Sequence, residues 1–167
     1  MRIAFIDFDG TLFDERESLE QASLKVLGKK LSKEEIRKLP KNIKSKIYET
    51  NITEFYNLYK PIKEGIDRVL ELKRQGYKII ILTARLCKNK EFVEKILKSN
   101  NIPYDELICR EDLSLKDEEW KAKTIKEFLE KFKAEDIVVL EDKEENIAYI
   151  EKYLNRKIKG ILIINQN

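Results

Sequence analysis

The sequence predicts an α/β protein whose core is a doubly wound parallel sheet, with a small helical segment inserted after the first strand. From residue 61 onward, short apolar runs alternate with stretches of helical periodicity. This alternation is typical of parallel strands that are buried between two layers of helices. From Asp14 to Lys60, apolar residues recur only at helical spacing and no strand-like run interrupts them, which indicates an all-helical segment.

Five short runs are expected to form the sheet. They are five to seven residues long and mostly rich in β-branched residues, as suits strands covered on both faces. The first comprises residues 2–8 (RIAFIDF), and three more comprise 77–82 (YKIIIL), 136–140 (DIVVL) and 160–164 (GILII). A weaker fifth strand is expected at 105–109 (DELIC).

Four amphipathic helices are expected between these strands. Their apolar faces consist of Ile62, Ile66, Val69 and Leu70; of Phe92, Val93, Ile96 and Leu97; of Trp120, Ile125, Phe128, Leu129 and Phe132; and of Ile147 with Ile150. In the inserted segment the helical spacing is carried by Leu19, Leu24, Leu27, Ile36, Ile43 and Ile47. Pro61 marks the return to the core, so we expect a core of residues 1–13 and 61–167 and a helical unit of residues 14–60.

The composition limits the kinds of catalytic and metal-binding groups that the protein can use. Among 167 residues there is no histidine, which excludes Ser-His-Asp and Cys-His catalysis and disfavours zinc. The net charge of +3 does not by itself indicate a nucleic-acid or membrane partner. Cys87 and Cys109 have no metal-binding spacing, and we expect them to be reduced thiols near strand ends. Any catalysis must use carboxylates, hydroxyls, lysine, arginine or a hard metal ion.

The expected location is the cytoplasm. The chain starts directly with the strand-like MRIAFIDFD, which leaves no room for a signal peptide. No apolar run approaches the ~20 residues that a membrane helix needs. We therefore expect a soluble protein that does not associate with a membrane, and the sequence predicts no oligomeric state.

Two carboxylates follow the first strand, in Asp7-Phe8-Asp9-Gly10-Thr11-Leu12. The carboxyl ends of strands form the ligand crevice of a doubly wound sheet, and period-two alternation puts Asp7 and Asp9 on one side of the chain. Such proximity is unfavourable unless a cation or a proton separates the charges. One of the two carboxylates can therefore bind Mg²⁺ and attack phosphorus, while the other holds a proton for the leaving group.

This DFDGTLFD stretch resembles the first motif of the haloacid dehalogenase (HAD) superfamily. The resemblance implies a HAD-like Rossmannoid core with a small cap and a Mg²⁺-dependent phosphatase activity. It further implies that Asp7 forms an aspartyl-phosphate and that Asp9 acts as acid and then as base. Because an acid stands at position 9, the resemblance favours phosphoryl transfer over dehalogenation.

Three further motifs appear in the order that the resemblance requires. Thr83, with Ala84 after the strand YKIIIL, would bind the phosphoryl group, and Arg85 either adds a bidentate phosphate contact or is an ordinary surface arginine. A lysine near Trp120 would neutralise charge, and Lys121 and Lys123 are both candidates, with Lys121 preferred. The expected metal ligands are Asp7, Asp9, Asp142 and Glu141, and Glu145 or Asn146 either adds an outer-shell group or only starts a helix.

The cap segment is basic and bears on the substrate. Nine Lys/Arg against two acids lie between Lys25 and Lys46, which predicts either a lid that attracts polyanions or an ordinary solvated surface. A helical stripe of Tyr48, Ile52, Phe55 and Tyr59 is interpreted as packing. The expected substrate is a small phosphorylated metabolite or a nucleotide, as in a nucleotidase. A polynucleotide 3′-phosphatase acting on nucleic-acid ends, a phosphotransferase or mutase, and a non-catalytic phosphate-binding module remain alternatives.

Overall fold

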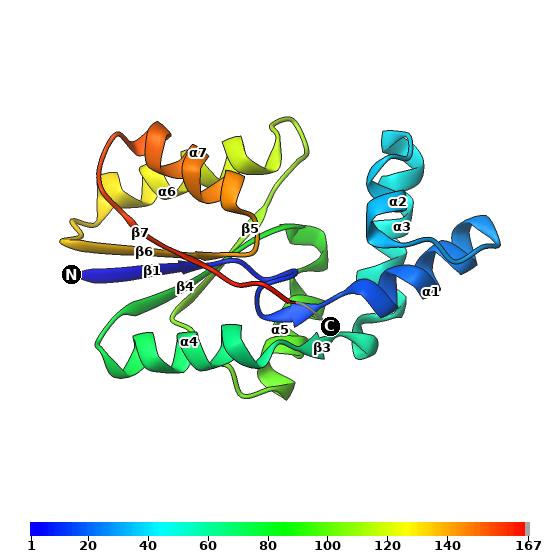
Figure 1. The fold of residues 1–167 in the computed structure, drawn as a ribbon, viewed down its shortest axis with the longest axis horizontal. Coiled ribbons are helices and arrows are strands. Elements are labelled where there is room, and N and C mark those ends of the chain that lie inside the picture. The colour runs from blue at the N-terminus through cyan, green and yellow to red at the C-terminus, as the bar shows by residue number, and fades with distance from the viewer. Residues whose placement is uncertain (166–167) are drawn as a thin grey trace.

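The computed structural model describes residues 1–165 and is built on a five-stranded parallel sheet of strand order β5-β4-β1-β6-β7 (Figure 1). The strands are β1 (Arg2–Ile6), β4 (Lys78–Leu86), β5 (Glu106–Arg110), β6 (Asp136–Glu141) and β7 (Lys159–Leu162). Strand β1 lies in the middle, where Ile3 pairs with Lys78 of β4 and with Ile137 of β6. The predicted fold class is confirmed.

Helices cover both faces of the sheet (Figure 1). Helices α4 (Lys63–Arg74) and α5 (Lys90–Ser99) lie on one face, and α6 (Asp117–Lys131) and α7 (Glu144–Leu154) on the other. Because alternate residues of β1 face opposite sides, Ala4 and Ile6 join one hydrophobic cluster and Ile3 and Phe5 join the other. Leu70 was expected on the apolar face of α4 but is exposed, since it lies at the edge of that face.

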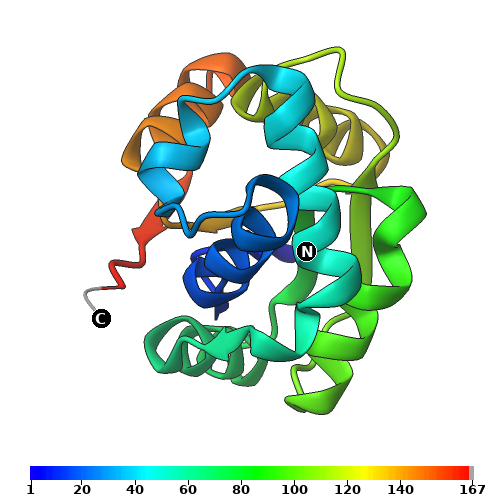
Figure 2. The same ribbon diagram turned by 90° about the vertical axis from the view of Figure 1, so that its right-hand side faces the viewer.

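The inserted segment is helical, as expected. It contains α1 (Arg16–Leu27), the short α2 (Lys33–Arg37), α3 (Lys41–Glu54) and a 3₁₀ turn, η1 (Tyr56–Leu58). A glycine in left-handed conformation, Gly28, ends α1, and a capping box of Ser32 and Glu35 starts α2. The three helices share a cluster of their own, formed by Leu19, Ala22, Leu31, Ile36 and Ile47. They lie beyond the carboxyl edge of the sheet (Figures 1 and 2).

A two-residue ladder joins this segment to the core. Strand β2 (Phe13–Asp14) pairs antiparallel with β3 (Lys60–Pro61), so the two ends of the segment lie side by side. The sequence did not predict these strands, because two residues are too few to show a period. The chain therefore leaves the core and returns to it at one place.

Strand β4 is longer than expected and carries a bulge. Leu82 pairs with Ile108 of β5 and Leu86 with Arg110, so residues 83–85 have no regular partners in the ladder. Just beyond the bulge, a second 3₁₀ turn, η2 (Cys87–Asn89), begins.

The prediction of two reduced thiols was wrong. Cys87 and Cys109 form a disulfide, with their Cα atoms 5.0 Å apart. Cys109 lies in β5 beside the end of β4, and adjacent parallel strands bring Cα atoms within the range that a disulfide needs. Their separation of 22 residues in the sequence gave no indication of this proximity.

Among residues 1–165, no helix has both the length and the apolar character needed to cross a membrane.

Candidate active site

Asp7 lies directly after β1, at the carboxyl edge of the sheet, and its carboxylate is held from two sides. The ammonium of Lys121, from α6, donates to Oδ1 at 2.7 Å, and the Thr11 hydroxyl donates to Oδ2 at 2.7 Å. All three side chains are buried. Thr11 belongs to the DFDGTL motif, but the sequence did not assign it this role.

Glu141 and Asp142, at the end of β6, complete a group of three carboxylates with Asp7. One oxygen from each lies within 4.8 Å of the others, an arrangement that could hold a metal ion. The ligand set is entirely oxygen, which suits a hard cation such as Mg²⁺. Gly10 makes room for this group, because a Cβ there would collide with the Asp142 carboxylate, and its φ of 81° also favours glycine.

The charges in this group are strongly perturbed. Burial, together with the charge of Asp7 and the hydrogen bond and charge of Glu141, raises the pKa of Asp142 to about 9. Burial alone would lower the pKa of Lys121, but the carboxylates of Asp7 and Glu141 outweigh it and hold that pKa well above its ordinary value. Lys121 therefore stays an ammonium, and it pairs with Asp7 and Glu141 but not with Asp142. A divalent cation would relieve the remaining repulsion, so the residues fit a Mg²⁺ site.

Of the two candidate lysines, Lys121 is the one that the structure places in the site. Its Nζ also donates to Glu141 Oε2 at 2.8 Å, whereas Lys123 is exposed. At the start of α7, Asn146 is buried and lines the cavity described below, whereas Glu145 is exposed.

Asp9 stands apart from the three carboxylates and is held by a different cation. Both of its oxygens accept from Arg85: Nε donates to Oδ2 and Nη2 to Oδ1, each at 2.9 Å. The Tyr59 hydroxyl also donates to Asp9 Oδ1, at 3.1 Å. Arg85 further donates to the backbone oxygen of Tyr48 in α3, at 3.0 Å, and to the Tyr59 hydroxyl.

This contact differs from the role expected for Arg85. The sequence allowed either a contact to substrate phosphate or a surface position, but Arg85 is buried and most of its guanidinium N–H groups are directed at Asp9, Tyr48 and Tyr59. Both tyrosines belong to the inserted segment, so Arg85 links that segment to the carboxylate that follows β1. The predicted stripe packs as expected: Ile52 and Tyr59 in the core, and Tyr48 and Phe55 against the cluster of the inserted segment. Tyr48 also lines the cavity.

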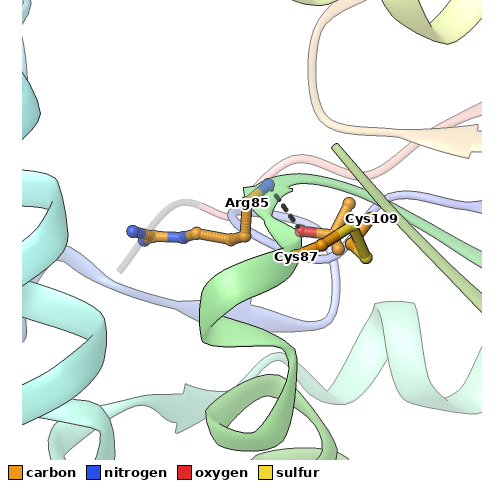
Figure 3. The surroundings of a disulfide bond; sticks show 4 residues. Arg85, Cys87 and Cys109 are labelled. Carbon is orange, nitrogen blue, oxygen red and sulfur yellow. Dashed lines mark hydrogen bonds between the residues drawn. A yellow bond between two sulfur atoms is a disulfide. The ribbon is translucent and has the colours of Figure 1, made fainter. Parts of the chain in front are cut away.

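Thr83, Ala84 and Arg85 all lie in the bulge of β4. Thr83 is buried, and its Oγ1 accepts from the backbone N–H of Arg85 at 3.1 Å. Figure 3 shows the Arg85 side chain extending away from the Cys87–Cys109 disulfide, which fastens the end of the bulge to β5. Ala84 and Arg85 line the cavity, while Thr83 is not among its lining residues.

The carboxyl edge of the sheet opens into a cavity of about 650 Å³. This volume is within the usual range of small-molecule sites. One wall comes from α2 and α3, and the opposite wall from the loop between β5 and α6. Lys33, in α2, reaches the floor and pairs with the buried Glu15, whose pKa is raised by burial and by the charge of Asp9. The sequence did not single out either residue for such a role, because nothing in their local pattern indicates this contact.

Comparison with known proteins bears on the fold. No protein-family model matches the chain, and none of the curated proteins matches it. Several solved structures, in contrast, match the chain over most of its length. A Thermotoga maritima protein provisionally named a β-phosphoglucomutase superposes with a TM-score of 0.66 at 18% identity, covering 100% of this chain and 88% of that one. A HAD hydrolase of family IA, variant 3, from Entamoeba histolytica superposes with a TM-score of 0.63 at 16% identity, covering 96% of this chain and 84% of that one.

The chain has the HAD fold. A chain of the Pnkp1/Rnl/Hen1 complex also superposes, with a TM-score of 0.57 at 19% identity, but this chain spans only 47% of its length. Proteins named as hydrolases and phosphatases are among these neighbours, at 16–17% identity. In this fold, Asp7 of the first motif lies beside Glu141 and Asp142 of the last motif, at the carboxyl ends of the paired strands β1 and β6.

Proposed function

We propose that this chain is a Mg²⁺-dependent phosphomonoesterase in which Asp7 is the nucleophile. The observation that carries the proposal is the position of Asp7 between Lys121 and Thr11, beside Glu141 and Asp142, at the edge of an open cavity. A buried carboxylate with a fixed cation and a potential metal site has the parts that phosphoryl transfer requires. Residues 14–60 would act as the cap over a core of residues 1–13 and 61–167.

The proposed reaction has two steps. An Asp7 oxygen attacks phosphorus, the bond from phosphorus to the leaving oxygen breaks, and Asp9 transfers a proton to that oxygen. Water then attacks the aspartyl-phosphate and gives its proton to Asp9, and release of Asp7 yields inorganic phosphate. Lys121 stabilises negative charge around the transferred group in both steps.

The metal would be held by Asp7, Asp142 and Glu141. When bound, Mg²⁺ neutralises charge on the phosphoryl oxygens and lets the carboxylates coexist with a phosphate dianion. Asp9 is not placed among the ligands in this proposal, because both of its oxygens are engaged by Arg85. Proton transfer by Asp9 therefore requires that the substrate's leaving oxygen replace one of these two contacts.

Hydrolysis of p-nitrophenyl phosphate with and without Mg²⁺ tests the activity. Asp7→Asn should lower kcat by more than about 10³-fold, because it removes the covalent route. Lys121→Ala should lower it by about 10²-fold, the size expected for one electrostatic stabiliser, while the exposed Lys123→Ala serves as the matched control. Mass spectrometry of an acid-quenched reaction should show one added phosphoryl group on Asp7. Hydrolysis that persists after exhaustive chelation, or in Asp7→Asn, would refute the proposal.

A further inference from the structure

The basic cap segment divides into cations that face the cavity and cations that do not. On α3, the lining residues Lys41, Lys44, Ser45 and Tyr48 recur at the i, i+3, i+4 and i+7 spacing of a single helix face, and Glu49 follows them at the floor end. Arg37, at the end of α2, lines the same wall. The remaining basic residues of that stretch that line no part of the cavity are Lys25, Lys29, Lys30, Lys38 and Lys46.

Three of the four cap cations that line the cavity have no acidic partner among residues 1–165, and the fourth, Lys33, is paired. Within residues 1–165, Arg37, Lys41 and Lys44 form no ion pair, whereas Lys25 pairs with Glu54 and Lys33 with Glu15. Three positive charges without an ion-pair partner of their own therefore face one concave space, whose lining acids Glu49 and Asp117 are paired with Lys88 and Arg110. Low-dielectric walls around such a space focus the field and attract anions.

These three cations also lie away from the phosphoryl site on the cavity floor. Tyr48 marks the floor end of α3, because its backbone oxygen accepts from Arg85. Lys41 is at the other end of the same helix face, so seven residues of helical rise place it about 10 Å further along the axis. On the floor, Lys121, Arg85 and Lys33 are all already paired with carboxylates.

We infer that the site takes a phosphomonoester whose leaving group carries a second phosphate, bound by Arg37, Lys41 and Lys44. The inference rests on the proposed function and names its substrate class. The phosphate to be hydrolysed binds at Asp7, and the second phosphate binds the cap cations, with the Arg37 guanidinium able to hold it through two N–H groups. Lys116 of the opposite wall lies at the same cavity and has no ion pair within the described chain, which adds to the field.

Matched substrate pairs test this inference. Thymidine 3′-phosphate is compared with thymidine 3′,5′-bisphosphate, and fructose 6-phosphate with fructose 1,6-bisphosphate, so that a nucleotide source and a sugar source are separated. In each pair the measured quantity is the ratio of kcat/KM, bisphosphate over monophosphate. Three charge contacts worth a few-fold each predict a ratio of about tenfold or more for at least one pair.

Two double variants test whether Lys41 and Lys44 are responsible for the preference for a bisphosphate. In Lys41→Gln/Lys44→Gln, the ratio should fall to within about twofold of unity. Lys38→Gln/Lys46→Gln removes the same charge from exposed cap positions outside the cavity, and its ratio should stay that of the wild type. The wild-type ratio should also shrink with added salt, as the Debye length falls from about 10 Å at 0.1 M to about 3 Å at 1 M.

The outcomes separate the two proposals. Hydrolysis of p-nitrophenyl phosphate together with ratios near unity for both pairs would overturn this inference and leave the phosphatase intact. Equal loss of the ratio in both double variants would also overturn it, because net charge rather than the α3 face would then be responsible. Absence of hydrolysis of every substrate would refute the phosphatase itself. A ratio that falls only in Lys41→Gln/Lys44→Gln would establish the second phosphate site.

Discussion

Asp7 and Asp9 are two residues apart, yet each is held by a different cation from a different element. Lys121 of α6 holds Asp7, and Arg85 of β4 holds Asp9. The first pair belongs to the core alone, while the second also contacts Tyr48 and Tyr59 of the cap segment. Substitutions in the two pairs should therefore have different kinetic effects.

Arg85→Lys tests whether Arg85 positions Asp9 or binds substrate. Lysine cannot make the two parallel contacts of a guanidinium, so Asp9 would lose its fixed orientation. We expect kcat to fall by about 10- to 100-fold with little change in KM, because the loss affects proton transfer. The exposed Arg68→Lys on α4 is the control. A rise in KM with unchanged kcat would instead support the phosphate contact that the sequence suggested.

Gly10→Ala tests the space beside Asp142. Its φ is 81°, and a Cβ would also collide with the Asp142 carboxylate. We expect a loss of about 1–2 kcal/mol of stability from the backbone and about a tenfold rise in the Mg²⁺ concentration needed for half activity.

Gly28→Ala is the matched control for that substitution. Gly28 has a φ of 76°, but a Cβ there would meet nothing within 4 Å. It should lower the melting temperature similarly and leave the Mg²⁺ requirement unchanged. An equal shift of the Mg²⁺ requirement in both variants would contradict the proposed placement of Asp142.

The sequence predicted that the acidic residues of the site lie together, but it did not predict the contacts of Arg85. Asp7, Glu141 and Asp142 follow strands that pair side by side, so position along the chain is enough to bring them together. The contact between Arg85 and Asp9 spans 76 positions and depends on how a bulge directs one side chain. No local period encodes that direction, and the sequence therefore left Arg85 as either a phosphate ligand or a surface residue.

At the scale of elements, the bulge of β4 is the feature that places Thr83 and Arg85. Residues 83–85 leave the regular ladder between the Leu82–Ile108 and Leu86–Arg110 pairs, and the Cys87–Cys109 disulfide follows immediately (Figure 3). A bulge next to a site is a common way to redirect a side chain. Its end is fixed by a covalent bond, so the disulfide should matter for both stability and activity.

Cys87→Ser/Cys109→Ser tests this dependence. The disulfide closes a loop of 22 residues, and its loss should lower the free energy of unfolding by about 3 kcal/mol. For a chain of this size that corresponds to a melting temperature lower by about 10 °C, measured by circular dichroism. Reductant should have the same effect on the wild type and none on the double variant. An unchanged melting temperature in reductant would mean that the ladder alone holds the bulge.

At the scale of the whole molecule, the cap segment and the core are expected to unfold together. Ile52 and Tyr59 of the segment belong to the same hydrophobic cluster as Phe8 and Val93 of the core. A polar contact adds to this, since Asn89 Nδ2 donates to Glu49 Oε2 at 2.7 Å. Shared packing of this kind couples the stability of the two parts.

Calorimetry of two variants tests the coupling. Ile36→Val, in the cluster of the cap segment, and Ile80→Val, in the sheet, should each remove about 0.5–1.5 kcal/mol. Each should lower one common transition by a few degrees, with the calorimetric and van't Hoff enthalpies remaining equal. Two separate transitions, of which each variant shifts only one, would show that the segment unfolds independently.

The order of the strands along the chain has a consequence for synthesis. Strand β1 comes first among the sheet strands but needs β4 on one side and β6 on the other, and β6 ends only at Glu141. A chain emerging from the ribosome therefore holds Asp7 early, while the edge of β1 that β6 will cover stays open until β6 has been made. Closing the long loops between these strands is entropically unfavourable until pairing compensates for it. The central strand and the active site should thus be completed in the same late step of folding, when β6 inserts beside β1 and brings Glu141 and Asp142 to Asp7.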